Sequence, residues 1–343
     1  MKVLHISSGD KFIVPFVQLV KDNFKFDEHH FLISEGIAAD KVMRAKNIFV
    51  SDSSLSSKLK RLLLTLINMH RAERVIIHGL FDKKLIYLLF LCPWLLKKCY
   101  WFIWGGDLYT FQSEFKTLKW KFNEFIKSTV IKQIGNLVTY VKGDIEIAKT
   151  VYSARGKHHE CLMYTSNLYS ELKILNNAEN TIHIQVGNSA DPSNNHLEVF
   201  EKLKPFANEN IQVHVPLSYG NSKNAEKVIA EGTKLFGEKF NPMTELLPFD
   251  DYLLFLSKVD IAFFNHNRQQ AMGNIITLLG LGKKVYMRED TSHWELFDSI
   301  GVDIFSVKKF GGLDKEQMIS NQRKIRQYFS KSNYLSQLES ILN

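Results

Sequence analysis

Cysteine is scarce in this chain, and the sequence has no long apolar run. The three cysteines form no CxxC pair and leave an odd number, so we expect reduced thiols and no disulfide framework. The longest apolar stretch, residues 85–96, contains Pro93 and is too short to span a bilayer, which needs about 20 residues. No cleavage site follows the first strand-like run, so we expect no signal peptide.

Motifs for metal and dinucleotide chemistry are also missing. No cluster of histidine and cysteine has the spacing of metal ligands, and we expect the pairs His29-His30 and His158-His159 to be solvated. The sequence has no DxD motif, because the carboxylates at 250–251 are adjacent and are typical of a helix cap. No GxGxxG follows a predicted strand, which argues against an NAD-dependent dehydrogenase. We therefore predict an activity that uses neither a metal ion nor a cofactor.

The length and composition are typical of a folded protein with two domains. At 343 residues, with 45% apolar and 23% charged residues, the chain is too long for one ordinary core and too apolar for disorder. The net charge of +8 is uneven: residues 1–180 hold 26 Lys and Arg against 17 Asp and Glu, whereas residues 181–343 hold 18 against 19. This excess predicts an anionic partner for the first half. Nucleic acid is not the partner that we expect, because we find no reader motif or groove-sized basic face.

Short apolar runs alternate with amphipathic ones along the chain. In the first half, the predicted strands are Lys2–Ser7, His30–Ser34, Asn47–Val50, Arg74–His78, Tyr100–Ile103 and Leu137–Tyr140. Between them, apolar residues three and four apart predict helices at Leu55–Met69, Asp82–Leu96 and Glu114–Ile134. This alternation indicates βαβ units and a parallel sheet.

The alternation restarts after a polar stretch at residues 168–180, which is typical of a linker. The predicted strands of the second half are Thr181–Val186, Ile211–Pro216, Met243–Leu246, Ile261–Asn265, Lys284–Met287 and Asp303–Phe305. We therefore predict an α/β fold of two facing Rossmann-like domains with parallel sheets, at residues 1–176 and 177–343. In this prediction the last helix is free to pack back on the first domain.

The turn after the strand at 181–186 carries small polar residues. They are Gly187, Asn188, Ser189, Asp191 and Asn194. Ligands of parallel sheets bind outside the carboxyl ends of the strands, and small residues there let backbone N–H groups approach a phosphate. An ordinary capped turn is the alternative.

A second strand end, after residues 261–265, precedes an apolar helix and carries an arginine. Its candidate residues are Arg268, Gln269, Gln270, Gly273 and Asn274. A guanidinium can donate bidentate hydrogen bonds to phosphate, and the helix N-terminus adds favourable potential. We predict that this turn holds a diphosphate; a buried structural arginine or a plain loop is the alternative.

Three strand ends of the first half carry groups that can accept or donate protons. Asp10 follows the first strand, His78 ends the strand at 74–78, and Asp107 follows the aromatic segment 100–104 and two glycines. The carboxyl ends of parallel strands lie at one edge, so we expect these three residues to gather there. A carboxylate in that place can accept a proton from a hydroxyl. The alternative is that the aromatic residues belong to the core and that Asp107 caps a helix.

Two predicted helices account for the positive excess. Residues 57–71 and 114–133 combine Lys and Arg with Leu, Phe and Trp. Basic amphipathic helices with aromatic residues are typical of binding to an anionic membrane surface. An ordinary solvated helix that covers a sheet is the alternative.

Three of these segments also carry a family likeness. Residues 103–109, 186–194 and 268–273 resemble the bacterial TDP-4-acetamido-4,6-dideoxygalactose (TDP-Fuc4NAc) transferases of enterobacterial common antigen synthesis, the 4-alpha-L-fucosyltransferase family. Residues 78–81, 215–220 and 288–289 are more weakly similar. The resemblance implies a GT-B glycosyltransferase with its nucleotide sugar in the C-terminal domain. It also implies a polyprenyl-diphosphate-linked saccharide as the acceptor and peripheral attachment to the cytoplasmic face of the inner membrane.

We therefore predict transfer of a sugar from a TDP- or UDP-sugar without a metal ion. Arg268 and the amides of Gln269 and Gln270 would offset the charge of the departing diphosphate. Tyr219 would contact the donor, and Glu289 would accept a hydrogen bond from its ribose.

Asp10 is the preferred candidate for the base that deprotonates the acceptor, followed by Asp107 and then His78. Two alternatives stay open. One is a UDP-sugar-dependent transferase of another glycan pathway, and the other is a protein that binds a nucleotide sugar without transferring it.

Overall fold

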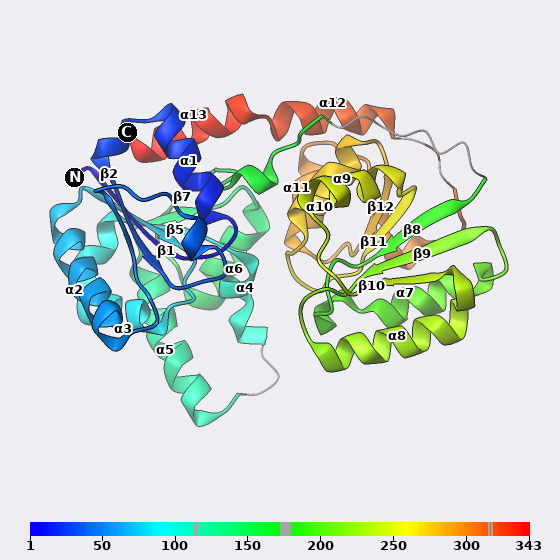
Figure 1. Cartoon of the computed structure of the whole chain (residues 1–343), viewed down its shortest axis with the longest axis horizontal. Helices are drawn as coiled ribbons and strands as arrows, with labels where there is room; N and C mark the ends of the chain where they lie inside the picture. Colours follow the sequence, from blue (N-terminus) through cyan, green and yellow to red (C-terminus); the bar gives the residue numbers. More distant parts are fainter. Residues whose placement is uncertain (113–115, 172–179, 315, 317) are drawn as a thin grey trace. The chain divides into compact units, whose positions relative to one another are not determined.

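The computed structural model describes residues 1–112, 116–171, 180–314, 316 and 318–343. The chain forms two compact units, one made of Met1–Ser166 and Lys331–Asn343 and the other of Asn167–Ser330 (Figure 1). The predicted boundary at 176–177 and most of the predicted linker lie outside the described residues.

The first unit is built on a seven-stranded parallel sheet with the order β3-β2-β1-β4-β5-β6-β7. Its strands are β1 (Val3–Ser8), β2 (His29–Ser34), β3 (Ile48–Val50), β4 (Arg74–His78), β5 (Cys99–Phe102), β6 (Asn136–Val138) and β7 (Lys157–His159). Its helices are α1 (Ile13–Asn23), α2 (Leu55–Arg71), α3 (Lys83–Leu91), α4 (Gly105–Leu108), α5 (Leu118–Gln133), α6 (Lys142–Tyr152) and α13 (Lys331–Leu342). Helices α2, α3 and α5 cover one face of the sheet, and α1 and α13 cover the other (Figure 1).

The second unit has a six-stranded parallel sheet with the order β10-β9-β8-β11-β12-β13. Its strands are β8 (Ile182–Val186), β9 (Ile211–Pro216), β10 (Phe240–Met243), β11 (Ile261–Phe264), β12 (Lys284–Met287) and β13 (Phe305–Ser306). Its helices are α7 (His196–Leu203), α8 (Ser222–Phe236), α9 (Phe249–Lys258), α10 (Met272–Gly280), α11 (Ser292–Ser299) and α12 (Ile319–Tyr328).

Each sheet has one point where the strand order reverses, between β1 and β4 in the first unit and between β8 and β11 in the second. At such a point the loops that leave neighbouring strands diverge to opposite faces, which opens a crevice at the carboxyl ends. The central strands are largely buried, which explains why Val, Ile, Leu and Phe predominate in them. The topology thus marks one place in each unit where a ligand is expected.

Helix α13 completes the first unit although it follows the second unit in the chain. Tyr334, Leu338 and Ile341 are fully buried there. The N–H of Leu162 donates to Gln337 Oε1 at 2.9 Å, and the Arg74 guanidinium donates to the carbonyl of Ile341 at 3.1 Å.

No helix among the described residues is both long and apolar enough to cross a membrane.

The bounds of most predicted strands are confirmed within one or two residues. The errors concern segments that contain proline and the two histidine pairs. The strand predicted at Met243–Leu246 is wrong, because the strand runs from Phe240 to Met243 and includes Pro242. Proline is tolerated there because β10 is an edge strand. The helix predicted at 82–96 ends at Leu91, and Pro93 starts a separate 3-10 helix at Pro93–Lys98.

The histidine pairs do not have the expected solvation. His29 is the first residue of β2. Its side chain is buried, and its Nδ1 lies 3.0 Å from His5 Nε2. His158 and His159 belong to β7, the other edge strand, which the sequence analysis missed. His159 Nε2 lies 2.9 Å from Asn136 Oδ1 on the neighbouring strand, so this pair is part of the sheet.

The long basic helix of the first unit begins later than predicted. Residues 118–133 form α5, and the Thr117 hydroxyl accepts a hydrogen bond from the N–H of Trp120. Thr117 is thus an ordinary N-cap. The first residues of the predicted helix, 114–115, lie outside the described residues.

Candidate functional site

The turn after β8 lies at the point where the second sheet reverses its order, and it requires a glycine. Gly187 has a φ of +69°, in the left-handed region. A Cβ at this position would lie 2.7 Å from both Asn194 Oδ1 and His196 Nε2. Any side chain would therefore be strained in its backbone and would collide with two polar groups. The glycine lets the chain turn closely over the residues that follow.

Asn194 holds this turn together from the inside. Its side chain is fully buried, and its Oδ1 accepts hydrogen bonds from the N–H of Asn188 and from His266 Nε2, each at 2.9 Å. Its Nδ2 donates to the carbonyl of Asp191 at 2.9 Å. Burial keeps the pKa of His266 well below its ordinary value, so that ring is neutral. Asn194 thus fixes the shape of the loop and ties it to the loop after β11.

The loop after β11 brings Arg268 to the same place. Arg268 Nη2 lies 3.3 Å from Asp191 Oδ2, and the two side chains are 24% and 40% exposed. Asp191 Oδ1 accepts hydrogen bonds from the N–H and the hydroxyl of Ser193. Burial alone would raise the pKa of Asp191, but the bonds from Ser193 and Arg268 hold it below its ordinary value. A guanidinium with an ionised partner therefore stands at the edge of the sheet, within reach of solvent.

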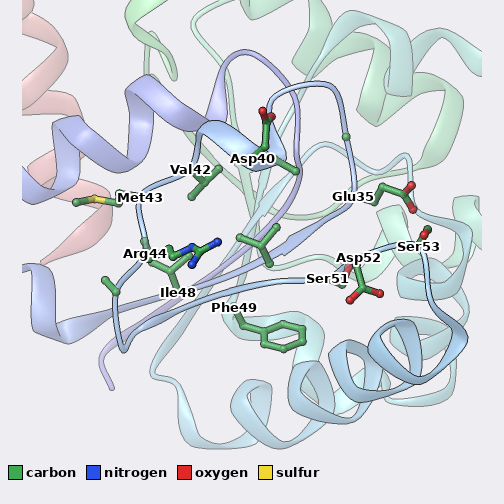
Figure 2. A pocket seen from close by; sticks show the side chains of 14 residues that line it. Glu35, Asp40, Val42, Met43, Arg44, Ile48, Phe49, Ser51, Asp52 and Ser53 are labelled. Carbon is green, nitrogen blue, oxygen red and sulfur yellow. The ribbon is translucent and has the colours of Figure 1, made fainter.

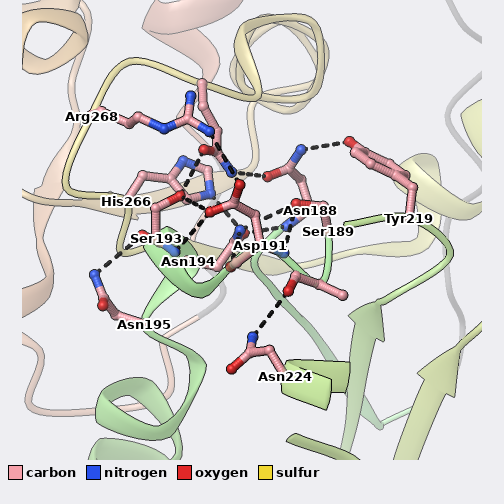
Figure 3. A network of polar contacts seen from close by, with 12 residues as sticks. Asn188, Ser189, Asp191, Ser193, Asn194, Asn195, Tyr219, Asn224, His266 and Arg268 are labelled. Atoms are coloured by element: carbon pink, nitrogen blue, oxygen red, sulfur yellow. Dashed lines mark hydrogen bonds and ion pairs between the residues drawn. The ribbon is translucent and has the colours of Figure 1, made fainter. Parts of the chain in front are cut away.

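Amide side chains connect these two loops with a third, after β9. Gln270 Nε2 donates to Asn188 Oδ1 at 2.9 Å, and Asn188 Nδ2 donates to the Tyr219 hydroxyl at 2.8 Å. Figure 3 shows the resulting polar network, in which Asn188 and Asp191 lie between Arg268 and Tyr219. Ser189 is buried beside them, and its Oγ lies 3.3 Å from Asn194 Nδ2. The structure thus brings together most of the donor-site residues predicted from two separate motifs.

Helix α10 begins immediately after these residues. Its first cap residue, Ala271, has a φ of +60°, and no side chain accepts a hydrogen bond from the first turn. A non-glycine residue in this conformation costs about 1 kcal/mol or more. Gly273 and Asn274 lie in the first turn, where Asn274 Nδ2 donates to the Tyr252 hydroxyl at 2.9 Å. Backbone N–H groups at this helix start are therefore not satisfied by a side-chain cap.

Two other predicted residues lie outside this network. Gln269 stands between Arg268 and Gln270 in the loop and is partly exposed. Glu289 follows β12, and its Oε1 lies 2.9 Å from Lys309 Nζ. The structure places Glu289 at the same edge of the sheet as Arg268, since β11 and β12 are parallel neighbours.

In the first unit, Asp10 stands at the reversal point between β1 and β4. Its Oδ1 accepts from the N–H groups of Phe12 and Ile13 at 2.8 and 3.2 Å, and its Oδ2 accepts from the Ser8 hydroxyl at 2.7 Å. The carboxylate therefore has a fixed orientation at the start of α1, and it stays partly exposed. It is the one predicted proton-transfer group that keeps access to solvent.

Asp107 and His78 are turned inward. The Asp107 carboxylate is fully buried and accepts hydrogen bonds from the N–H groups of Leu80 and Trp104 and from Trp101 Nε1, at 2.7 to 2.8 Å. Burial raises the pKa of Asp107 to about 6, against the opposing effects of these bonds and of nearby Lys127. The carboxylate thus ties β4 to the start of α4, the capping role considered as the alternative.

His78 uses both ring nitrogens inside the unit. Its Nδ1 lies 2.7 Å from the Tyr164 hydroxyl, and its Nε2 lies 3.2 Å from His5 Nδ1. Burial lowers its pKa to about 3, so the ring is neutral near pH 7. The three residues expected at one edge therefore separate into one exposed carboxylate and two internal side chains, which disfavours His78 and Asp107 as the base.

The sequence analysis missed several members of the polar network, among them Ser193 and His266. Ser193 lies in the segment 186–194, which carries the family likeness. Its place two residues after Asp191 is typical of an aspartate whose side chain accepts a hydrogen bond from the backbone ahead of it. His266 gave no such signal, because its partner Asn194 is 72 residues away in the chain. Only the topology brings these two residues together.

The first unit also contains an open hollow of about 780 Å³ beside the loop that joins β2 to β3. Its lining includes Glu35, Asp40, Arg44 and Asp52 (Figure 2). None of the residues predicted for the site lines it. Among the parts of the chain that the structure describes, no group of three His, Cys, Asp or Glu could hold a metal ion.

Comparison with known structures shows the fold class. Alr3699/HepE of Anabaena, solved in complex with UDP, is 11% identical with a TM-score of 0.67, and the match covers 100% of this chain and 99% of that one. Trehalose 6-phosphate synthase of Burkholderia multivorans is 8% identical with a TM-score of 0.59, covering 99% and 95%. WaaG, a glycosyltransferase involved in lipopolysaccharide biosynthesis, is 11% identical with a TM-score of 0.57, covering 100% and 94%. The two parallel-sheet α/β units thus form a GT-B fold, as the resemblance implied.

The sequence also matches one family model over nearly its whole length. The matched residues are 10–342, and the model describes the 4-alpha-L-fucosyltransferases, glycosyl transferase group 56. This match includes the turn after β8, the Arg268 loop and Asp10. The chain therefore belongs to the 4-alpha-L-fucosyltransferase family, glycosyl transferase group 56, and is a glycosyltransferase.

Proposed function

We propose that this glycosyltransferase moves a 4-acetamido-4,6-dideoxyhexose or a related sugar from a TDP-sugar to a saccharide carried on polyprenyl diphosphate, in surface polysaccharide synthesis. One observation carries the donor half of the proposal. Arg268 stands at the reversal point of the second sheet, directly before the uncapped start of α10. A guanidinium and backbone N–H groups at one place are suited to the diphosphate of a nucleotide sugar.

Arg268 would stabilise the departing diphosphate. The Asp191 carboxylate now holds the guanidinium at 3.3 Å, and this partly exposed pair contributes little to stability. A diphosphate carries more negative charge than one carboxylate and would compete for the same donors. The N–H groups of Gly273 and Asn274 would add the favourable potential of a helix start. The negative charge that develops on the leaving group would then be offset without a metal ion.

The neighbouring amides and hydroxyls would contact the rest of the donor. Asn188, Gln270 and Tyr219 form a chain of hydrogen bonds whose outer member, Tyr219, is about half exposed. Such a chain can exchange one internal bond for a bond to a sugar hydroxyl at little cost. Glu289, at the end of the next strand, would accept a hydrogen bond from the ribose.

Asp10 would act as the base if the reaction inverts the anomeric centre. Three hydrogen bonds from Ser8, Phe12 and Ile13 orient its carboxylate, and the side chain stays partly exposed. Asp10, at the carboxyl edge of the first sheet, would therefore deprotonate the acceptor hydroxyl.

The first unit would bind the lipid-linked acceptor at an anionic membrane surface. On α2, Leu55, Leu59 and Leu63 are exposed at a spacing of four residues, beside Lys58 and Lys60. A helix of this kind buries its apolar stripe among lipid headgroups while its lysines contact anionic lipid. Attachment to the cytoplasmic face of the inner membrane is the location that we propose.

The α5 helix adds aromatic residues on the same side of the sheet. Leu118, Phe122 and Phe125 are exposed there, and α3 lies between α5 and α2 (Figure 1). Together these helices offer a broad apolar surface, larger than scattered single residues would make.

Release of free nucleotide tests the proposal. Purified protein is incubated with TDP-sugar or UDP-sugar and a bacterial membrane lipid extract, and both the free nucleotide and the mass of the lipid product are measured. We expect TDP release that depends on the lipid extract, and a lipid product heavier by one sugar. Transfer from UDP-sugar alone would support a transferase of another glycan pathway. Donor binding without any product would support a nucleotide-sugar-binding protein.

A further inference from the structure

Three aromatic side chains follow three neighbouring strands of the first sheet. Phe12 comes after β1, Phe81 after β4 and Trp104 after β5, and these strands are adjacent in the sheet. The ring centroids of Phe12 and Phe81 lie 5.0 and 5.8 Å from that of Trp104, with interplanar angles of 78° and 85°. Both phenylalanine rings therefore stand nearly at right angles to the indole. We call this group the aromatic corner.

The aromatic corner keeps apolar surface in contact with water. Phe81 is 48% exposed, and Phe12 and Trp104 are partly exposed. By contrast, the aromatic residue after the next strand, Tyr140 after β6, is buried. Exposed rings at the carboxyl edge of a parallel sheet, where ligands of this fold class bind, indicate a surface for a ligand with an apolar face.

Gly79 makes room for Phe81 in the corner, and Gly106 lies in contact with the same ring. A Cβ at Gly79 would lie 2.5 Å from Phe81 Cε2, and a Cβ at Gly106 would lie 3.4 Å from Phe81 Cε1. Gly79 also has a φ of +81°. The Phe81 ring thus lies over both glycines, and the segments at 78–81 and 104–107 form one interlocked support. Asp107 fastens this support from below through the N–H groups of Leu80 and Trp104.

The indole of Trp104 is held by a directed chain of buried hydrogen bonds. Trp104 Nε1 can only donate, and it donates to the Tyr164 hydroxyl at 3.0 Å. One set of tautomers that satisfies these contacts has the Tyr164 hydroxyl donate to His78 Nδ1 at 2.7 Å and His78 Nε2 donate to His5 Nδ1 at 3.2 Å. His5 in turn donates from Nε2 to His29 Nδ1 at 3.0 Å.

This chain gives the aromatic corner a fixed geometry. Burial lowers the pKa values of His5, His78 and His29, so the rings are neutral near pH 7. A buried polar chain that is fully satisfied is rigid, because any rotation leaves a donor or an acceptor unpaired. The indole cannot turn about its own axis without breaking the hydrogen bond from its Nε1 to the Tyr164 hydroxyl. The Trp104 face is therefore presented at one angle.

We propose that the aromatic corner is a subsite for one pyranose ring of the saccharide acceptor. The C–H face of the sugar would lie on the indole of Trp104, and Phe12 and Phe81 would bound its edges. Asp10 accepts from the N–H of Phe12, so its carboxylate stands beside the corner, where a sugar hydroxyl can reach it. This inference rests on the proposed function and names the part of the acceptor that the first unit recognises. Tyr164 and His78 are positioning residues in it.

Saturation-transfer NMR with methyl N-acetyl-β-D-glucosaminide and methyl β-D-glucoside tests the subsite without donor or lipid. We expect saturation of the ring C–H protons in the wild type, and a loss of at least fivefold in Trp104→Ala and Phe81→Leu. Trp94→Ala is the matched control, because Trp94 is 61% exposed in the same unit and its Nε1 also donates to a side chain, His70 Nε2, at 3.2 Å. Equal losses in Trp94→Ala and Trp104→Ala, or no saturation in the wild type, would overturn the subsite.

Two further measurements separate this proposal from that of the donor site and from a change in folding. Calorimetric titration with TDP should give the same affinity for Trp104→Ala as for the wild type. Loss of saccharide binding with unchanged TDP binding would then be assigned to the aromatic corner and not to the donor site or to misfolding. For Tyr164→Phe we expect a shifted ¹⁵N resonance of the Trp104 indole and a rise in the acceptor KM with kcat nearly unchanged. An unshifted indole signal or an unchanged KM would contradict the positioning role of Tyr164.

Discussion

Replacing Arg268 by alanine should lower turnover at least a hundredfold. The guanidinium is one charged donor aimed at the position proposed for the leaving diphosphate. Loss of one such contact in a transition state costs about 2.7 to 4 kcal/mol, or a factor of 10² to 10³ in rate. The fold should survive the change, because Arg268 is 24% exposed and Asp191, its partner, is 40% exposed and would be solvated when left alone.

Lysine at this position separates charge from geometry. Arg268→Lys keeps the positive charge but loses the planar fork that can bind two phosphate oxygens. We therefore expect it to lie between the wild type and Arg268→Ala, with a roughly tenfold loss of turnover. Steady-state release of TDP gives the rate, and calorimetric titration with TDP gives the affinity in the ground state.

The matched control is Arg326→Ala. Arg326 lies on α12 of the same unit and forms a similar exposed pair, with its Nη1 3.4 Å from Glu171 Oε1. We expect wild-type turnover and TDP affinity for this variant. Turnover of Arg268→Ala within threefold of the wild type, or equal losses in both variants, would refute the assignment of the diphosphate to this helix start.

Three further predictions concern the base, the membrane and the buried histidines. Asp10→Asn should lower turnover by about 10² to 10⁴ with TDP affinity unchanged, and a normal rate would exclude Asp10 as the base. Leu59→Glu with Leu63→Glu should lower co-sedimentation with anionic vesicles at least tenfold, whereas Leu246→Glu in the second unit, equally exposed, should not. Burial lowers the pKa of His78 from 6.5 to about 3, so its stabilising effect is complete above pH 6.5 and falls as the pH drops, by about 1.4 kcal/mol per unit. Urea unfolding at pH 7.5, 6.5, 5.5 and 4.5 measures the summed slope of the buried histidines, which should be at least about 1.4 kcal/mol per unit because burial also lowers the pKa values of His5, His29 and His266. Equal free energies of unfolding at pH 6.5 and 4.5 would contradict it.

The fold and the shape of the turn after β8 were predictable because both follow from local sequence patterns. Strands of a parallel sheet appear as short, mostly apolar runs, and Gly187 with its polar neighbours marks where one such run stops. Arg268 was identifiable for the same reason, as a charged residue in the loop after an apolar strand. These signals need no knowledge of distant parts of the chain.

The orientation of strand-end side chains could not be predicted in this way. Asp10 and Asp107 both follow a glycine after a strand of the first sheet, but the Asp107 carboxylate is turned inward by the N–H of Leu80, which follows β4, and by Trp101 Nε1 on β5. His78 is turned inward by Tyr164, which is 86 residues away in the chain. Whether a carboxylate faces water or the core depends on partners that only the assembled sheet supplies. For the same reason the edge position of β10, which tolerates Pro242, became clear only from the strand order.

The return of α13 to the first unit has a consequence for synthesis on the ribosome. Residues 167–330 are translated before Tyr334 and Leu338, which fill the core of the first unit. Part of the apolar interior of the first unit therefore stays uncovered while the second unit is translated. A nascent chain arrested near residue 330 should present that interior to chaperones, although all seven strands of the first sheet have already been synthesised.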